Sequence, residues 1–157
     1  MIGAWLAAAR LCGAITATWP EVPPQRACPA ALAITAEHGA WSPTLVAAIA
    51  YHETGFNGSL VGSRGECGPM QVAWPARKRV ALCAAARADV FTAYAQGVGR
   101  LDLCLAYCGG GDGFCALNVY AAGPRGRNRT TPGEAQREFL ELERALARHF
   151  RPLEPSS

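Results

Sequence analysis

The sequence predicts a mainly α-helical fold in a single compact domain. Proline and glycine residues divide the chain into helical segments, and no segment shows the sustained alternation of apolar and polar residues that marks a β-strand. The 157 residues are 50% hydrophobic and 17% charged, a balance that is typical of one domain with a substantial core. Two full domains of ordinary size would not fit in this length.

The N-terminal part is expected to form a helix followed by a linker. Residues 2–9 are apolar, but no basic residue precedes them and Arg10 interrupts them, so they fit an uncleaved helix better than a cleaved secretory signal. No apolar run reaches the roughly 18–20 residues of a membrane-spanning helix. Prolines cluster between Pro20 and Pro24. We therefore assign residues 1–27 to an N-terminal helix and linker, residues 28–152 to the main domain and residues 153–157 to a C-terminal tail.

Two short helices are expected in the first half of the main domain. The first spans Pro29–His38, where apolar residues recur at helical spacing before a glycine. The second opens at Ser42-Pro43, which supply an N-cap and a first-turn proline, and runs to about Thr54 before Gly55. Residues 56–68 are rich in glycine and serine, which predicts an exposed loop.

Three helices are expected in the second half. A long amphipathic helix covers residues 88–107, where apolar side chains follow helical periodicity. A short helix follows at Gly113–Ala122 and is closed by Gly123-Pro124. The last helix opens at a capping box, Thr131 to Glu134, which has a proline at its first helical position. Its apolar face is expected to carry Phe139, Leu142, Leu146 and Phe150.

The charge pattern argues against nucleic-acid binding and against a metal site. The chain has fifteen Lys and Arg residues and twelve Asp and Glu residues, which gives a formal net charge of +3. The longest basic run, Arg77-Lys78-Arg79, is too short to follow a phosphate backbone. His38 and His149 stand without the neighbouring ligands that a metal ion requires. We expect neither a metal nor another cofactor.

The cysteine content indicates disulfides and an oxidising compartment. Seven cysteines occur without the paired CxxC spacing of a zinc site. Cys104 and Cys108 lie four residues apart on a predicted helix, where Cβ atoms are about 5–6 Å apart, farther than the roughly 3.5–4.5 Å of a disulfide. The candidate pairs are therefore Cys115 with Cys104 or Cys108, Cys67 with Cys83, and Cys12 with Cys28, with one thiol left over. Buried cysteines that act as small apolar side chains are the alternative.

Glu53 lies at an unusual place for a carboxylate. Leu45, Ile49 and Glu53 follow one another at i, i+4 and i+8, so Glu53 continues the apolar stripe of its helix. The helix C-terminus and apolar surroundings both disfavour a negative charge there. A glutamate that keeps its proton near neutral pH acts as a general acid. The alternative is a frayed last turn with Glu53 in solvent.

Three segments then carry a resemblance to a known family. They are His52-Glu53-Thr54-Gly55-Phe56-Asn57, Ser63 to Gln71, and Asn118 to Pro124. In this order they resemble the three motifs of soluble lytic transglycosylases, over roughly residues 29–124. The family's Gly-Leu-Met-Gln is Gly-Pro-Met-Gln here, and its Tyr-Asn-Ala-Gly is Tyr-Ala-Ala-Gly. The resemblance implies a lysozyme-like single domain of the goose-type lysozyme and lytic transglycosylase class. It also implies cleavage of the β-1,4 bond between N-acetylmuramic acid and N-acetylglucosamine in peptidoglycan.

The resemblance also implies roles for single residues. Glu53 would be the catalytic glutamate, Ser63, Met70 and Gln71 would line the sugar groove, and Tyr120 would stand near the carboxylate. Met70 could equally be an ordinary core methionine. A second carboxylate for a two-carboxylate glycosidase would have to be Glu66, which we expect to be a solvated loop charge.

The predicted function is therefore a peptidoglycan lytic transglycosylase that works without a cofactor. In the family's route the substrate's N-acetyl group assists and Glu53 deprotonates the muramic C6 hydroxyl, which gives a 1,6-anhydro sugar. The alternatives are a hydrolytic muramidase and a wall-binding structural or virion component that cuts little. The partner is the glycan strand, in the periplasm or cell wall. The weak resemblance of the N-terminus to a secretory signal suits a lysin carried by a phage particle or a secretion apparatus. Subunits of that particle or apparatus would be further partners. An exported cell-wall enzyme is the alternative.

Overall fold

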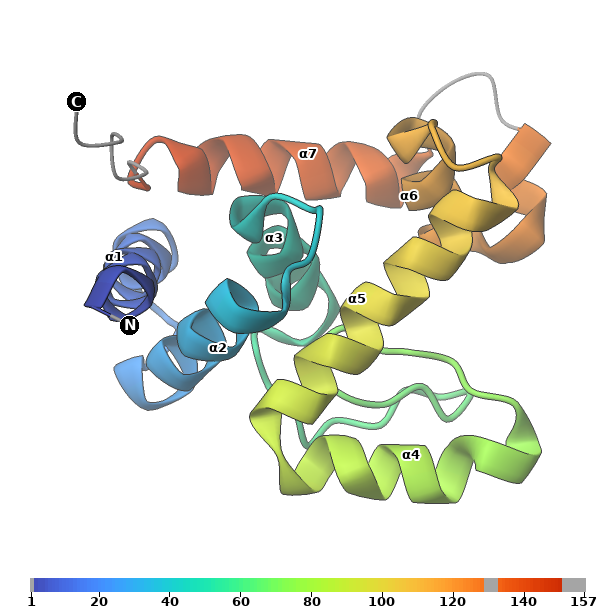
Figure 1. Cartoon of the computed structure of the whole chain (residues 1–157), viewed down its shortest axis with the longest axis horizontal. Helices are drawn as coiled ribbons and strands as arrows, with labels where there is room; N and C mark the ends of the chain where they lie inside the picture. The colour runs from blue at the N-terminus through green and yellow to red at the C-terminus, as the bar shows by residue number, and fades with distance from the viewer. Residues whose placement is uncertain (1, 129–132, 151–157) are drawn as a thin grey trace.

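The computed structural model describes residues 2–128 and 133–150. Within these residues seven α-helices and one 3₁₀-helix follow one another (Figure 1). Extended pairing in the same residues is limited to isolated bridges at Val61–Cys67 and Cys67–Val72. The prediction of a mainly α fold is confirmed. None of the helices in this part of the chain combines the length and the apolar character needed to cross a membrane. The expected tail at 153–157 lies outside the described residues.

Helices α1 (Ile2–Thr18) and α2 (Pro24–Glu37) share one hydrophobic core. Leu11 and Ile15 of α1 are fully buried in the same cluster as Ile34 of α2. A disulfide between Cys12 and Cys28 joins the two helices. The expected boundary after residue 27 therefore falls inside α2, which begins at Pro24 rather than at Pro29.

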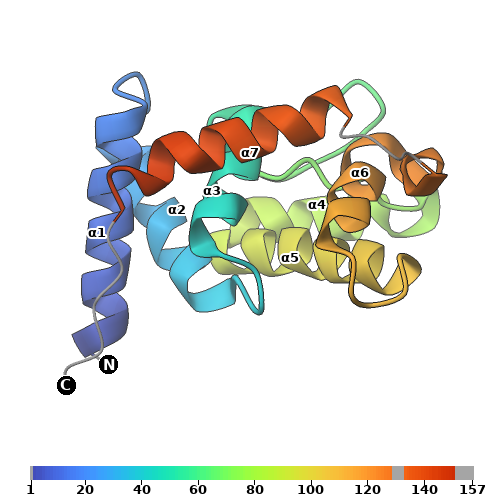
Figure 2. The same ribbon diagram turned by 90° about the horizontal axis from the view of Figure 1, so that it is seen from above.

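Helix α3 (Pro43–Thr54) lies at the centre of the molecule and matches its prediction. The Ser42 hydroxyl accepts a hydrogen bond from the Leu45 N–H at 3.0 Å, and Gly55 ends the helix in the left-handed conformation at φ 58°. Residues 44–50 are all buried. Helix α7 (Glu134–Ala147) crosses α3 and buries Phe139 and Leu146 (Figure 2).

The start of α7 differs from the predicted capping box. Gly133 occupies the N-cap position and makes no side-chain cap, so Glu134 is the first residue of the helix rather than its third. Thr131 and Pro132, which would form the box, lie outside the described residues.

Helices α4 (Ala76–Ala88), α5 (Val90–Tyr107) and α6 (Gly113–Ala122) form the other half of the molecule. Helix α4 was not predicted. Helix α5 begins at Val90, two residues after its predicted start, because Asp89 caps it by accepting from the Thr92 N–H at 2.8 Å. Helix α6 has its predicted bounds and leads into a 3₁₀-helix at Gly123–Asn128.

The predicted disulfides are confirmed, and the open choice for Cys115 is resolved. Cys12 pairs with Cys28, Cys67 pairs with Cys83, and Cys115 pairs with Cys108. Cys104 is the remaining thiol, and it is buried. Three disulfides are compatible with an extracellular or periplasmic location.

Candidate active site

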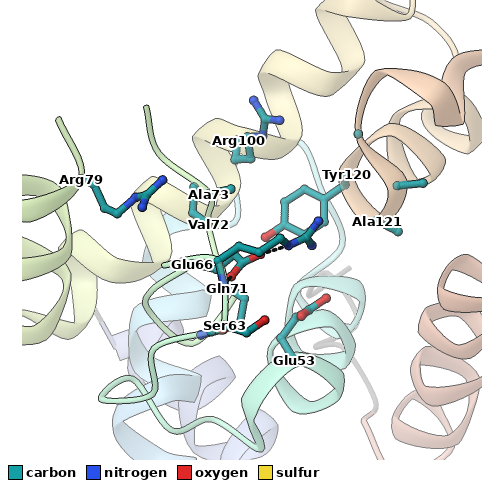
Figure 3. A pocket seen from close by; sticks show the side chains of 14 residues that line it. Glu53, Ser63, Glu66, Gln71, Val72, Ala73, Arg79, Arg100, Tyr120 and Ala121 are labelled. Carbon is teal, nitrogen blue, oxygen red and sulfur yellow. Dashed lines mark hydrogen bonds and ion pairs between the residues drawn. The ribbon is translucent and has the colours of Figure 1, made fainter. Parts of the chain in front are cut away.

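A cavity of about 490 Å³ opens beside the C-terminal end of α3 (Figure 3). We call it the Glu53 pocket. Its walls come from α3, from the loop over residues 62–73, and from helices α4, α5 and α6. The residues that line it include Glu53, Ser63, Glu66, Gln71, Arg100 and Tyr120. Segments that are far apart in the sequence therefore meet around one carboxylate.

Glu53 reaches the pocket from an ordered last turn of α3. The Gly55 N–H donates to the Tyr51 carbonyl at 2.8 Å, and the Thr54 hydroxyl donates to the carbonyls of Ala50 and Pro69. The last turn of α3 is therefore not frayed. The Glu53 side chain is 25% exposed, and it projects from α3 into the cavity in Figure 3. It stands at the edge of the core, within reach of a ligand.

His52 lies between two carboxylates and is not among the residues that line the pocket. Its Nδ1 lies 3.6 Å from Glu53 Oε1, and its Nε2 contacts Glu138 Oε2 of α7. The Glu53 carboxylate, helped by Glu138, raises the pKa of His52 above its ordinary value, although partial burial opposes this shift. His52 therefore contacts two carboxylates that favour its protonated form.

The loop that carries Ser63 and Gln71 is fixed at several points. The Cys67–Cys83 disulfide ties it to α4, and the Thr54 hydroxyl donates to the Pro69 carbonyl at 2.8 Å. Gln71 has a φ of 48°, which is a strained value for a residue with a side chain. Its amide nitrogen donates to the carbonyls of Gly68 and Leu60, so the bonds from Gln71 Nε2 go to the loop rather than into the pocket.

Tyr120 of α6 lines the pocket, but the Met70 side chain does not. The Tyr120 hydroxyl donates to the Met70 carbonyl at 2.6 Å. Burial, and next the Glu53 carboxylate, raise the pKa of Tyr120 well above its ordinary value, so the hydroxyl remains a donor. The Met70 side chain is fully buried in the main hydrophobic cluster. Its contribution to the pocket is the backbone carbonyl that holds Tyr120.

Glu66 departs from the expected solvated loop charge. Its side chain is only 13% exposed and pairs with the largely exposed Arg64, with Nε to Oε1 at 2.9 Å. The N–H of Arg64 donates to Oε2 at 3.0 Å. The backbone N–H of Glu66 itself, and then the contacts from Arg64, hold the pKa of the Glu66 carboxyl below its usual value against the opposing effect of burial. A second carboxylate thus lines the pocket, paired and ionised.

Two arginines of the pocket were missed by the sequence analysis. Arg79 of α4 and Arg100 of α5 both line the cavity, on the side across from Glu53 in Figure 3. Arg79 belongs to the basic run Arg77-Lys78-Arg79, which the sequence analysis considered only for nucleic-acid binding. Arg100 carries no motif, so only the packing of α5 against α6 reveals it.

Within the described residues no group of three His, Cys, Asp or Glu side chains is placed to hold a metal ion. Comparisons of the chain with protein-family models, with curated proteins and with solved structures find no match.

Proposed function

We propose that the protein is a peptidoglycan lytic transglycosylase with a lysozyme-like domain and that Glu53 is its catalytic acid and base. One observation carries the proposal: Glu53, Ser63, Gln71 and Tyr120, taken from three separate sequence motifs, line a single cavity. Met70, the fifth residue of that set, contributes the carbonyl to which Tyr120 donates. A groove of this size accommodates sugar residues, which bind through side chains of this polar kind.

The chemistry follows from one carboxyl group that acts twice. Protonated Glu53 donates its proton to the glycosidic oxygen while the bond from that oxygen to the muramic anomeric carbon breaks. The substrate's N-acetyl group stabilises the positive charge at that carbon. Glu53, now a carboxylate, takes the proton of the muramic C6 hydroxyl. At the same time the oxygen of that hydroxyl bonds to the anomeric carbon. The enzyme is restored, and the product carries a 1,6-anhydro ring.

A hydrolytic muramidase is the second candidate, because Glu66 lines the same pocket as Glu53. A two-carboxylate enzyme needs one of the pair to activate water or attack the sugar. Glu66 is a weak base in this setting, since Arg64 and backbone N–H groups occupy its oxygens. The C6 hydroxyl, in contrast, is part of the substrate and has a high effective concentration. The intramolecular route is therefore favoured.

The proposed place of action is the periplasm or cell wall, where the glycan strand is the partner. A protein carried by a phage particle or secretion apparatus and an exported enzyme would reach the same substrate. A wall-binding component that cuts little is distinguished from both by the assay below.

The Glu53→Gln variant tests the proposal. The amide keeps the size of the side chain but has no acidic proton, so it cannot act as a general acid. Clearing of a suspension of purified sacculi should therefore fall by several orders of magnitude, about 10³-fold or more. Glu141→Gln, on the exposed face of α7, is the matched control and should clear sacculi like the wild type.

Circular dichroism checks that both variants are folded. A folded Glu53→Gln variant that clears sacculi at the wild-type rate would show that the acid lies elsewhere. A wild-type protein that sediments with sacculi but leaves their turbidity unchanged would identify a binding component instead.

A further inference from the structure

The Glu53 pocket holds more guanidinium groups than carboxylates. Arg64, Arg79 and Arg100 line it together with Glu53 and Glu66. Arg64 is paired with Glu66. The pocket therefore carries an excess positive charge when both carboxylates are ionised, and a larger one when Glu53 is protonated for catalysis.

Arg100 is the guanidinium whose role within the fold is unexplained. It is half-buried on α5 and has no hydrogen bond or ion pair to any of the residues that the structure describes. It lies close enough to Tyr120 for its charge to act against the rise in the pKa of that phenol. Figure 3 places it across the cavity from Glu53, with Tyr120 between them.

Arg79 of α4 lines the same pocket, and part of its guanidinium is hydrogen-bonded within the fold. Its Nε and one terminal nitrogen donate to the Trp74 carbonyl at 3.4 and 3.3 Å, and its side chain lies against the backbone of Gly65. No carboxylate in the described part of the chain pairs with it. Burying part of an unpaired charge is unfavourable unless a ligand supplies the opposite charge.

We propose that Arg100, assisted by Arg79, binds a carboxylate carried by the peptide stem of the glycan strand. This inference rests on the proposed function, because the strand must lie in the pocket for its stem to reach these residues. The planar guanidinium forms two parallel hydrogen bonds with a carboxylate. The neutral sugar would occupy the side of Glu53 and Ser63, and the anionic stem the side of α4 and α5. The enzyme would thereby select strands that carry peptide stems with free carboxylates.

The test compares two forms of one substrate. Soluble glycan strands with peptide stems are used either as they are or after conversion of the stem carboxyl groups to amides. The kcat/KM of the wild type should be about 10- to 100-fold higher for the carboxylate form, because a charge-assisted hydrogen bond stabilises the transition state by an amount that corresponds to this factor. Arg100→Gln should bring that ratio close to one. Arg77→Gln, an exposed position on α4 outside the pocket, removes the same charge and should keep the ratio.

Each outcome decides between the two proposals. Equal cleavage of both forms by the wild type, or an equal loss on both forms in Arg100→Gln, overturns the carboxylate site and leaves the proposed function standing. Cleavage of neither form by the wild type overturns the proposed function and this inference with it. If Arg100→Gln does not fold, Arg100→Lys replaces it. The lysine keeps the charge without the planar pair of donors, so an unchanged ratio in that variant also overturns the site.

Discussion

A single hydrogen bond from Tyr120 links two walls of the Glu53 pocket. Its hydroxyl donates to the Met70 carbonyl at 2.6 Å, and so connects α6 to the loop that carries Gln71. Tyr120→Phe removes the donor and leaves that carbonyl without it, which should lower the free energy of unfolding by about 1–3 kcal/mol.

Urea denaturation measures the effect, and Tyr107→Phe is the control. Tyr107 is 46% exposed, and its ring contact with Arg127 survives in phenylalanine, so this change should stay within about 0.5 kcal/mol of the wild type. Equal stability of the two variants would show that the Tyr120 bond contributes nothing.

The raised pKa of His52 gives stability a specific dependence on pH. A histidine whose pKa is higher in the folded state stabilises the fold fully below its unfolded value of about 6.5, and that contribution is lost as the pH rises through the folded value. The free energy of unfolding should therefore fall as the pH rises above about 6.5. Glu138→Gln removes one of the two charges that raise the pKa and should reduce this fall.

Denaturation curves over that range test the assignment. Glu141→Gln lies on the same helix at an exposed position and should keep the wild-type slope. If Glu138→Gln keeps it as well, Glu138 is not a partner of His52 in solution.

The site residues that the sequence predicted are those marked by patterns within a few residues of them or by the family motifs. The position of Glu53 follows from the periodicity of α3 and from Gly55, both of which act within a few residues. Ser63, Gln71 and Tyr120 came from the resemblance alone. Arg100 could not be found in this way, because it enters the pocket only through the packing of α5 against other elements.

At the scale of elements, α5 passes very close to the loop at Gly97. A Cβ atom at this position would lie 3.0 Å from both Cβ and Cγ of Met70, which is fully buried and cannot move aside. Gly97→Ala should therefore destabilise the protein by about 1–3 kcal/mol through overpacking.

Gly99 supplies the control on the same helix. Nothing lies within 4 Å of a Cβ at Gly99, so Gly99→Ala should gain up to about 1 kcal/mol from helix propensity. Thermal unfolding of both variants measures the difference. A Gly97→Ala variant as stable as Gly99→Ala would show that the space between α5 and Met70 accommodates a Cβ atom.

The elements that were predicted correctly have strong local signals, and α4 does not. Helices α3 and α6 are bounded by caps and glycines that the sequence displays. Helix α4 begins after Pro75 without a side-chain cap and buries only Cys83 and Ala86, so it lacks the apolar stripe that reveals a helix. The Cys67–Cys83 disulfide attaches α4 to the pocket loop. This is a tertiary constraint, which helix propensity does not reveal.

At the scale of the whole molecule, the helices form a frame around a loop that carries the site residues. Helices α1, α2, α3, α5 and α7 share the main core, to which α6 adds Leu117. Helices α4, α5 and α6 also close the other sides of the Glu53 pocket. The sequence predicted the helical class of this frame. It did not predict that the first helix belongs to the core, because an apolar N-terminal segment has no periodicity that identifies its partner.

In the proposed reaction Glu53 directs the C6 hydroxyl, and not water, to the anomeric carbon. The identity of the new chain end tests it directly, because the two reactions share the same acid and differ only in the attacking oxygen. Sacculi digested in water enriched in ¹⁸O are analysed by mass spectrometry. We expect non-reducing 1,6-anhydro ends, each lighter by one water than a hydrolysed end, with no ¹⁸O. Reducing muramic ends that carry ¹⁸O would contradict it and would make Glu66 the first residue to test as the base.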